Sequence, residues 1–134
     1  MMAFGNIEGI APEIEAALLA VQITSPEQLL QMGSSPAGRK ELAARTGIDA
    51  RQLTELLNGV DLARVKGISE VFSNLLQEAG VGTVTELSRS VPANLRKRLE
   101  ETNAGRRLGH QIPKLEEIEA CVAEAKKLPK ILED

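Results

Sequence analysis

The stretch VKGISEVFSNLLQEAGVGTVTEL, residues 65–87, decides the fold of this chain. It opens with a glycine turn, Gly67-Ile68-Ser69, and the segment behind the turn places apolar residues at the i, i+3, i+4 and i+7 spacing of one helical face. The stretch IEGIAPEIEAALLAVQITSPEQL, residues 7–29, repeats this pattern, with Gly9 standing 58 residues before Gly67. We therefore predict an internal repeat.

Outward from these stretches, helix signals recur in the same order. Ser25-Pro26-Glu27-Gln28 and Thr83-Val84-Thr85-Glu86 both read as capping boxes, with a hydroxyl at the helix start and Gln or Glu three residues later. Two similar segments, PAGRKELAARTG and PANLRKRLEETN, then each begin a helix with proline. Each repeat closes with one more amphipathic helix. The predicted apolar faces of the four strongest helices are Ile14, Ala17, Leu18 and Val21; Phe72, Leu75, Leu76 and Ala79; Leu53, Leu56, Leu57 and Val60; and Ile118, Cys121, Val122 and Ala125.

No segment alternates apolar and polar residues over a sustained run, so no β-sheet is predicted. The helix–glycine turn–helix order, with IEGIAP at 7–12 and VKGISE at 65–70, is typical of the helix-hairpin-helix motif. We predict an all-α fold of two such units, residues 1–60 and 61–134, packed into one compact helical body without a flexible linker.

Over residues 7–130 the chain resembles a bacterial family of uncharacterised small proteins built from tandem helix-hairpin-helix motifs. The stretches that carry the resemblance are IEGIAP, SSPAGRKELAARTGI, DLARVKGISEVFSNLLQEAGVGTVTEL and IPKLEEIEACVAEAKKLP. The resemblance implies this fold and a role in binding nucleic acid or protein, and it carries over no settled activity. Two features depart from DNA-binding hairpins: Ala11 and Ser69 replace their second glycine, and the helices after the turns lack the usual Lys or Arg.

Charge separates the two hairpins. The net charge is -3, and no basic residue precedes Arg39. A phosphate backbone would be repelled by this acidic setting, so Gly9-Ile10-Ala11 is predicted to be a structural turn. The second hairpin, Lys66-Gly67-Ile68-Ser69, is flanked by Arg64, and it is predicted to be a structural turn in preference to a phosphate contact made through its backbone amides. A basic cluster follows it, which is either a solvated helix face or a binding surface: Arg89, Arg96, Lys97, Arg98, Arg106 and Arg107.

Other chemistry is poorly supported. The single cysteine, Cys121, lies on an apolar face and is predicted to be a core residue, and the single histidine, His110, to cap or decorate a loop. No catalytic set, phosphate-binding loop or dinucleotide motif is recognisable, so we predict no enzyme, no cofactor and no metal site. Without a signal peptide or an apolar stretch long enough to cross a bilayer, we expect a cytoplasmic protein with no membrane insertion.

These observations favour a non-enzymatic helical binding or adaptor module that acts through protein–protein interaction, including as a component of a larger assembly. Its partner would be another protein or a second copy of the chain. The alternative is non-sequence-specific binding of double-stranded DNA through the second hairpin and the basic cluster. The residues predicted to contact either partner are Arg64, Lys66, Gly67, Ile68, Ser69, Arg89, Arg96, Lys97, Arg98, Arg106 and Arg107.

Overall fold

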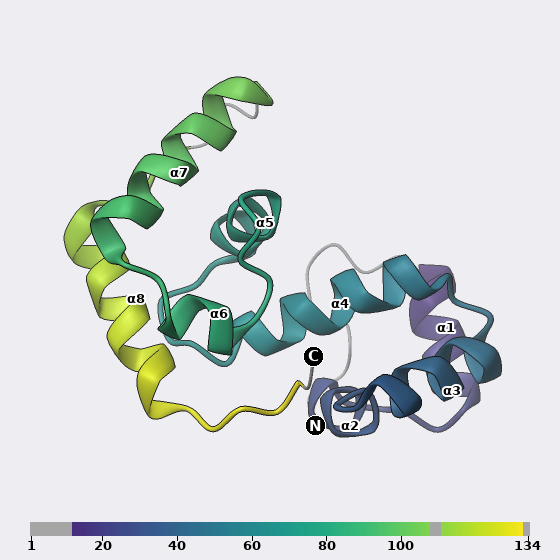
Figure 1. Ribbon diagram of the computed structural model, residues 1–134. Coiled ribbons are helices and arrows are strands. Elements are labelled where there is room, and N and C mark those ends of the chain that lie inside the picture. The colour runs from purple at the N-terminus through teal and green to yellow at the C-terminus, as the bar shows by residue number, and fades with distance from the viewer. Residues whose placement is uncertain (1–11, 108–110, 133–134) are drawn as a thin grey trace. The chain divides into compact units, whose positions relative to one another are not determined.

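Helices form all the regular secondary structure of residues 12–107 and 111–132, which are the parts of the chain that the structure, a computed structural model, describes (Figure 1). The predicted all-α fold is confirmed. The chain divides into two units, Met1–Asp61 with Ile131–Asp134, and Leu62–Lys130. This division differs from the predicted boundaries at the C-terminal end, because Leu132 is buried in the core of the first unit.

The first unit contains α1 (Pro12–Ala20), α2 (Pro26–Met32), α3 (Pro36–Thr46) and α4 (Ala50–Leu62), whose last residue already belongs to the second unit. Its core is entirely aliphatic, as expected of a sequence with so few aromatic residues. The predicted apolar faces of α1 and α4 both point into this core. Its buried residues are Leu18, Ile23, Leu29, Leu30, Leu42, Ile48, Leu53, Leu57, Val60 and Leu132.

The second unit contains α5 (Glu70–Glu78), α6 (Val84–Ser88), α7 (Pro92–Gly105) and α8 (Leu115–Lys127). The residues predicted on the apolar face of α8, including Cys121, are all buried, as are Phe72, Leu75 and Leu76 of α5. Helix α8 packs against both α6 and α7. Of the helices in the described segments, none has the length and apolar character that crossing a lipid bilayer requires.

The ends of α1 and α5 have matching geometry. Gln22 and Gly80, 58 residues apart, both adopt left-handed backbone conformations, with φ of 66° and 92°. The amide of the following residue then reaches back to the helix, from Ile23 to the carbonyl of Leu18 at 3.0 Å, and from Val81 to that of Leu76 at 2.8 Å. This is the Schellman arrangement, which satisfies carbonyls left unpaired at a helix end.

The starts of α2 and α6 also match. Ser25 Oγ accepts a hydrogen bond from the amide of Gln28 at 3.2 Å, and Thr83 Oγ1 accepts one from the amide of Glu86 at 3.1 Å, as predicted. The reciprocal half of each capping box is displaced by one residue. Gln28 and Glu86 accept from the amides of Thr24 and Gly82 instead of from the cap residues themselves. Two loops with the same unusual cap support a common origin of the two segments.

The correspondence breaks down after these short helices. Helix α2 has seven residues and α6 has five, so the proline that starts the next helix comes two residues earlier in the second unit. In the first unit, the end of α2 and the start of α3 approach each other closely at this corner, because a Cβ added to Gly38 would collide with the carbonyl oxygen of Met32. Counted from the prolines, Asn94 occupies the equivalent position in the second unit.

Candidate functional site

The second hairpin forms the predicted glycine turn. Gly67 has a φ of 97°, which a residue with a side chain adopts only at a cost, and Ser69 caps α5 by accepting the amide of Phe72 at 3.1 Å. The turn rests against α8. The Cys121 thiol points to the carbonyl oxygen of Lys66 at 4.0 Å, and a Cβ at Gly67 would lie 3.7 Å from the same sulfur. Packing and capping account for the shape of a structural turn at this place without any ligand.

The two cations beside the turn differ in their surroundings. The guanidinium of Arg64 donates a hydrogen bond to the carbonyl of Pro129 at 2.6 Å, which ties the turn to the segment after α8. Lys66 is exposed. Of this pair, Lys66 is therefore the cation that is directly accessible to a partner.

Three arginines of the basic cluster are held by the protein itself. Arg96 Nε donates to the carbonyl of Pro113 at 3.1 Å, and its Nη1 lies 2.5 Å from the carboxylate of Glu100. Arg98 Nη1 donates to the carbonyl of Ala79 at 3.3 Å, at the end of α5. Arg106 forms an ion pair of 2.6 Å with a carboxylate oxygen of Glu78.

The other three cations, Arg89, Lys97 and Arg107, are exposed, and no residue in the described segments forms a hydrogen bond or ion pair with their side chains. The cluster is therefore not one continuous row of unsatisfied charge. Half of it serves to hold α7 in place, and half of it remains for a partner.

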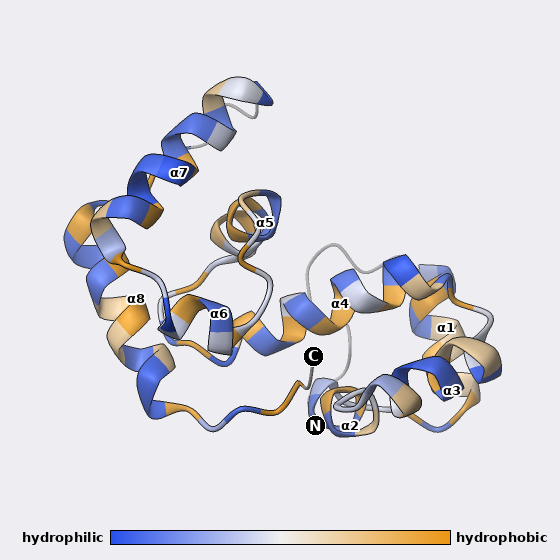
Figure 2. Ribbon diagram, viewed as in Figure 1, coloured by the Kyte–Doolittle hydropathy of each residue, from blue (hydrophilic) through white to orange (hydrophobic). Residues whose placement is uncertain are grey.

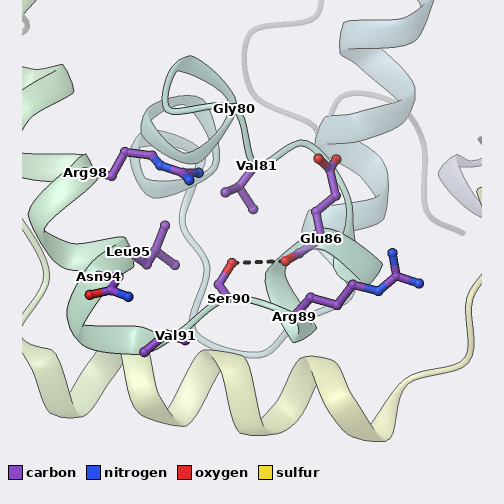
Figure 3. Close-up of a pocket in the computed structure, with 9 residues that line it drawn as sticks. All are labelled: Gly80, Val81, Glu86, Arg89, Ser90, Val91, Asn94, Leu95 and Arg98. Carbon is purple, nitrogen blue, oxygen red and sulfur yellow. Dashed lines mark hydrogen bonds between the residues drawn. The ribbon is translucent and has the colours of Figure 1, made fainter.

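A pocket of about 360 Å³ lies at the corner where α5, α6 and α7 of the second unit meet (Figure 3). It is the place where the short α6 departs from its counterpart α2. Val81 and Leu95 are buried here and form an aliphatic floor, whereas Val91 is 58% exposed at the rim. The lining residues are Gly80, Val81, Glu86, Arg89, Ser90, Val91, Asn94, Leu95 and Arg98.

Polar groups surround this floor. Figure 3 shows the guanidinium of Arg98 near Gly80 and Val81, while Arg89 extends on the opposite side of the pocket. Ser90 Oγ donates to the backbone carbonyl of Glu86 at 3.0 Å. The carboxylate of Glu86 accepts from the amide of Gly82 and lies against the Thr83 hydroxyl, both at 3.3 Å, so it is engaged in capping α6. An aliphatic floor with an arginine on each side suits a ligand that is both apolar and anionic.

The structure thus joins only two of the predicted site residues, Arg89 and Arg98, in one pocket. Lys66-Gly67-Ile68-Ser69 belong to a separate turn, whose recorded contacts are with α8 and with the start of α5. Sequence reasoning missed the other pocket residues. One signal in the sequence pointed to this corner: the interval from Thr83 to Pro92 is two residues shorter than the corresponding interval from Ser25 to Pro36.

The remaining predictions concern reactive groups. Cys121 is buried, and desolvation, followed by the charges of Glu117 and Glu124, raises the pKa of its thiol. It is a core residue, as predicted. His110 and the first turn, Gly9-Ile10-Ala11, lie outside the described residues. Within those residues, no three His, Cys, Asp or Glu side chains are grouped closely enough to hold a metal ion.

Comparison with protein families finds a match over residues 8–128 to the family described as "Domain of unknown function (DUF4332)". The match covers nearly the whole chain and both units. Comparison with the curated proteins and with the solved structures finds no match.

Proposed function

Because the chain belongs to the DUF4332 family, whose description specifies no activity, we propose its function from geometry: it is a non-enzymatic module that binds a protein partner. The pocket at the α5–α6–α7 corner is the docking site, and its ligand is an acidic segment that carries an aliphatic side chain. The observation that supports this most directly is the placement of Arg89 and Arg98 on two sides of an aliphatic floor.

The chemistry of the pocket fits such a segment. The aliphatic side chain would cover Val81 and Leu95 and shield Val91, which is 58% exposed. A carboxylate beside it would accept hydrogen bonds from Arg89, or from the donors of Arg98 that its bond to Ala79 leaves over. Hydrogen bonds to charged groups contribute about 1.5–3 kcal/mol when they are shielded from water, so one buried contact of this kind would anchor the segment.

The pocket is better suited to binding than to catalysis. Its one carboxylate, that of Glu86, is occupied by the cap of α6, and its hydroxyl, that of Ser90, is occupied by a backbone carbonyl. Neither group is paired with a base in the way that a nucleophile requires. The aliphatic floor and the cationic rim of the pocket instead resemble a protein interface, in which an apolar centre is surrounded by polar groups.

The second candidate function is non-sequence-specific binding of double-stranded DNA by the hairpin Lys66-Gly67-Ile68-Ser69 and the basic cluster. The exposed left-handed turn at Gly67, directly before α5, favours it. Engagement of Arg64, Arg96, Arg98 and Arg106 by the protein weakens it. With contacts from Lys66, Arg89, Lys97 and Arg107 only, the logarithm of the affinity should fall with the logarithm of salt concentration at a slope of about −3.6.

Site-specific photocrosslinking in the native cell tests the first function. A photoreactive amino acid at Val91 should give a discrete protein adduct, whereas one at Ala123, exposed on α8 of the same unit, should not. The adduct should disappear when Arg89→Glu is added to the Val91 probe, because that charge reversal repels an acidic segment without removing an internal contact. Equal adducts at both positions, or an adduct that survives Arg89→Glu, would contradict the proposal.

Fluorescence anisotropy with a labelled 20-base-pair duplex, at about 50 mM and about 150 mM salt, tests the alternative. No binding at the lower concentration removes DNA as a partner. Binding that Lys66→Ala and Lys97→Ala leave unchanged would show that the predicted surface is not the one used.

A further inference from the structure

Helix α1 has a mostly apolar face that is exposed among the described residues of the first unit. Its inner face contains Leu18, which is buried, and Ile14, Ala17 and Val21, which pack against the same core. The opposite face is also mostly apolar, and Leu19 on it is 47% exposed. Figure 2 shows α1 as largely hydrophobic, in contrast to the hydrophilic α7. The exposed residues of this outer face are Pro12, Glu13, Ala16, Leu19 and Ala20.

A surface helix normally carries polar residues outward, whereas four of the five exposed residues on the outer face of α1 are apolar. The outer face of α1 therefore has the character of a contact surface. It is also acidic: Glu13 and Glu15 lie in the first turn, and the last turn contains no basic residue. Glu15 and Leu19 are four residues apart, so they are neighbours on the helix surface.

This combination matches the ligand chemistry derived for the pocket. Leu19 supplies an aliphatic side chain, and Glu15 supplies a carboxylate one helical turn, about 5.4 Å, further along the axis. The pocket offers an aliphatic floor with Arg98 on one side and Arg89 on the other. Resting on the proposed function, we infer that the occupant of the pocket is the outer face of α1 from a second copy of this chain.

The contact would be head to tail. One copy presents α1 of its first unit and the other presents the pocket of its second unit, so the first copy keeps a free pocket and the second keeps a free α1 face. Such heterologous interfaces do not stop at a two-fold dimer; they form rings or extend. The contact surface of one helix is small, so the association should be weak and should depend on protein concentration.

Sedimentation velocity of the full chain over a concentration series is the experiment, with two variants that each remove one surface. Leu19→Asn removes the aliphatic anchor from an exposed position of α1. Val91→Asp places a negative charge at the rim of the pocket, at the N-cap position of α7, where Asp is favoured and the fold should be kept. Val71→Asn is the matched control, because Val71 is 47% exposed, as Leu19 is, but belongs to α5.

The wild-type chain and Val71→Asn should associate with rising concentration, and more weakly at about 500 mM than at about 50 mM salt, since the contact is partly electrostatic. Each of the other two variants alone should remain monomeric. Their equimolar mixture should form a one-to-one complex and nothing larger, because only one intact α1 face and one intact pocket are then present.

Two results would overturn this inference. A wild-type chain that stays monomeric at every concentration excludes the second copy, while the Val91 crosslink still decides independently whether another protein uses the pocket. Association that both variants leave unchanged, or a mixture that does not form the one-to-one complex, would show that the copies meet through other surfaces.

Discussion

Replacement of Arg96 by alanine should destabilise the second unit by about 1–2 kcal/mol, although the residue looks like one member of a basic surface cluster. Its Nε donates to the carbonyl of Pro113, directly before α8, and a hydrogen bond of this kind contributes about 1 kcal/mol net. The ion pair with Glu100, four residues on, adds about 0.3–0.5 kcal/mol, since both side chains are well exposed, at 38% and 51%.

Lys97 is the matched control, because it is the next residue on the same helix, carries the same charge and is exposed. Lys97→Ala should change the free energy of unfolding by less than about 0.5 kcal/mol. Urea denaturation followed by circular dichroism measures both variants, and amide hydrogen exchange in α8 reports whether the loss is local to that helix. Arg96→Lys should recover little, since an ammonium group cannot bond the carbonyl and the carboxylate as a planar guanidinium does.

If the urea concentration at the midpoint of unfolding is the same for Arg96→Ala and Lys97→Ala, Arg96 has no structural role. The comparison also bears on DNA binding. If both residues contacted phosphates, the two alanine variants should lower DNA affinity alike and reduce the salt slope by about one each. If Arg96 is structural, Arg96→Ala should lower stability and leave the salt slope unchanged, whereas Lys97→Ala should keep stability and reduce the slope by about one.

Four further predictions concern the backbone and the core. Val91→Asp should raise stability by about 1 kcal/mol in thermal denaturation, because the N-cap position of α7 has no side-chain hydrogen bond. Gln22→Gly should stabilise the protein by about 1 kcal/mol in urea titrations, because glycine adopts the positive φ of this position without strain. Gly80→Ala should destabilise it by about the same amount through backbone strain alone, because a Cβ at Gly80 would contact no other atom. Gly38→Ala should cost more, about 3 kcal/mol by the same measurement, as its Cβ would strike a backbone carbonyl. Burial raises the pKa of the Cys121 thiol above its ordinary value of 9.0, so the contribution of the neutral thiol to stability is complete below about pH 9.0 and is lost as the pH rises further. In urea titrations over a pH series, Cys121→Ala should therefore weaken the fall in stability at alkaline pH.

The helices and their inner faces were predictable because they depend on local signals. Ser25, Thr83 and the prolines at 26, 36 and 92 mark helix starts that the structure contains. The apolar spacing of α8 likewise predicted which of its residues are buried. Such features need no knowledge of distant parts of the chain.

The roles within the basic cluster were not predictable, because they depend on contacts across the sequence. Arg96 and Arg98 bond carbonyls 17 and 19 residues away, and no short-range pattern distinguishes them from Lys97 between them. The pocket was missed for a related reason: it lies beside a helix that is two residues shorter than its counterpart, and a residue count does not show that a pocket is present there.

The geometry of the two units diverges at their two corners. Up to the starts of α2 and α6, they share the left-handed position, the amide that closes it and the displaced cap, all at one spacing. Beyond that point the first unit draws its backbone together at Gly38, whereas the second has a side chain, Asn94, beside an open pocket. Under the proposed head-to-tail association, the cationic pocket of the second unit would receive the acids and the outward leucine of α1. The first unit would then act as the ligand and the second as the receptor, which would give the repeat a use although no basic residue precedes Arg39.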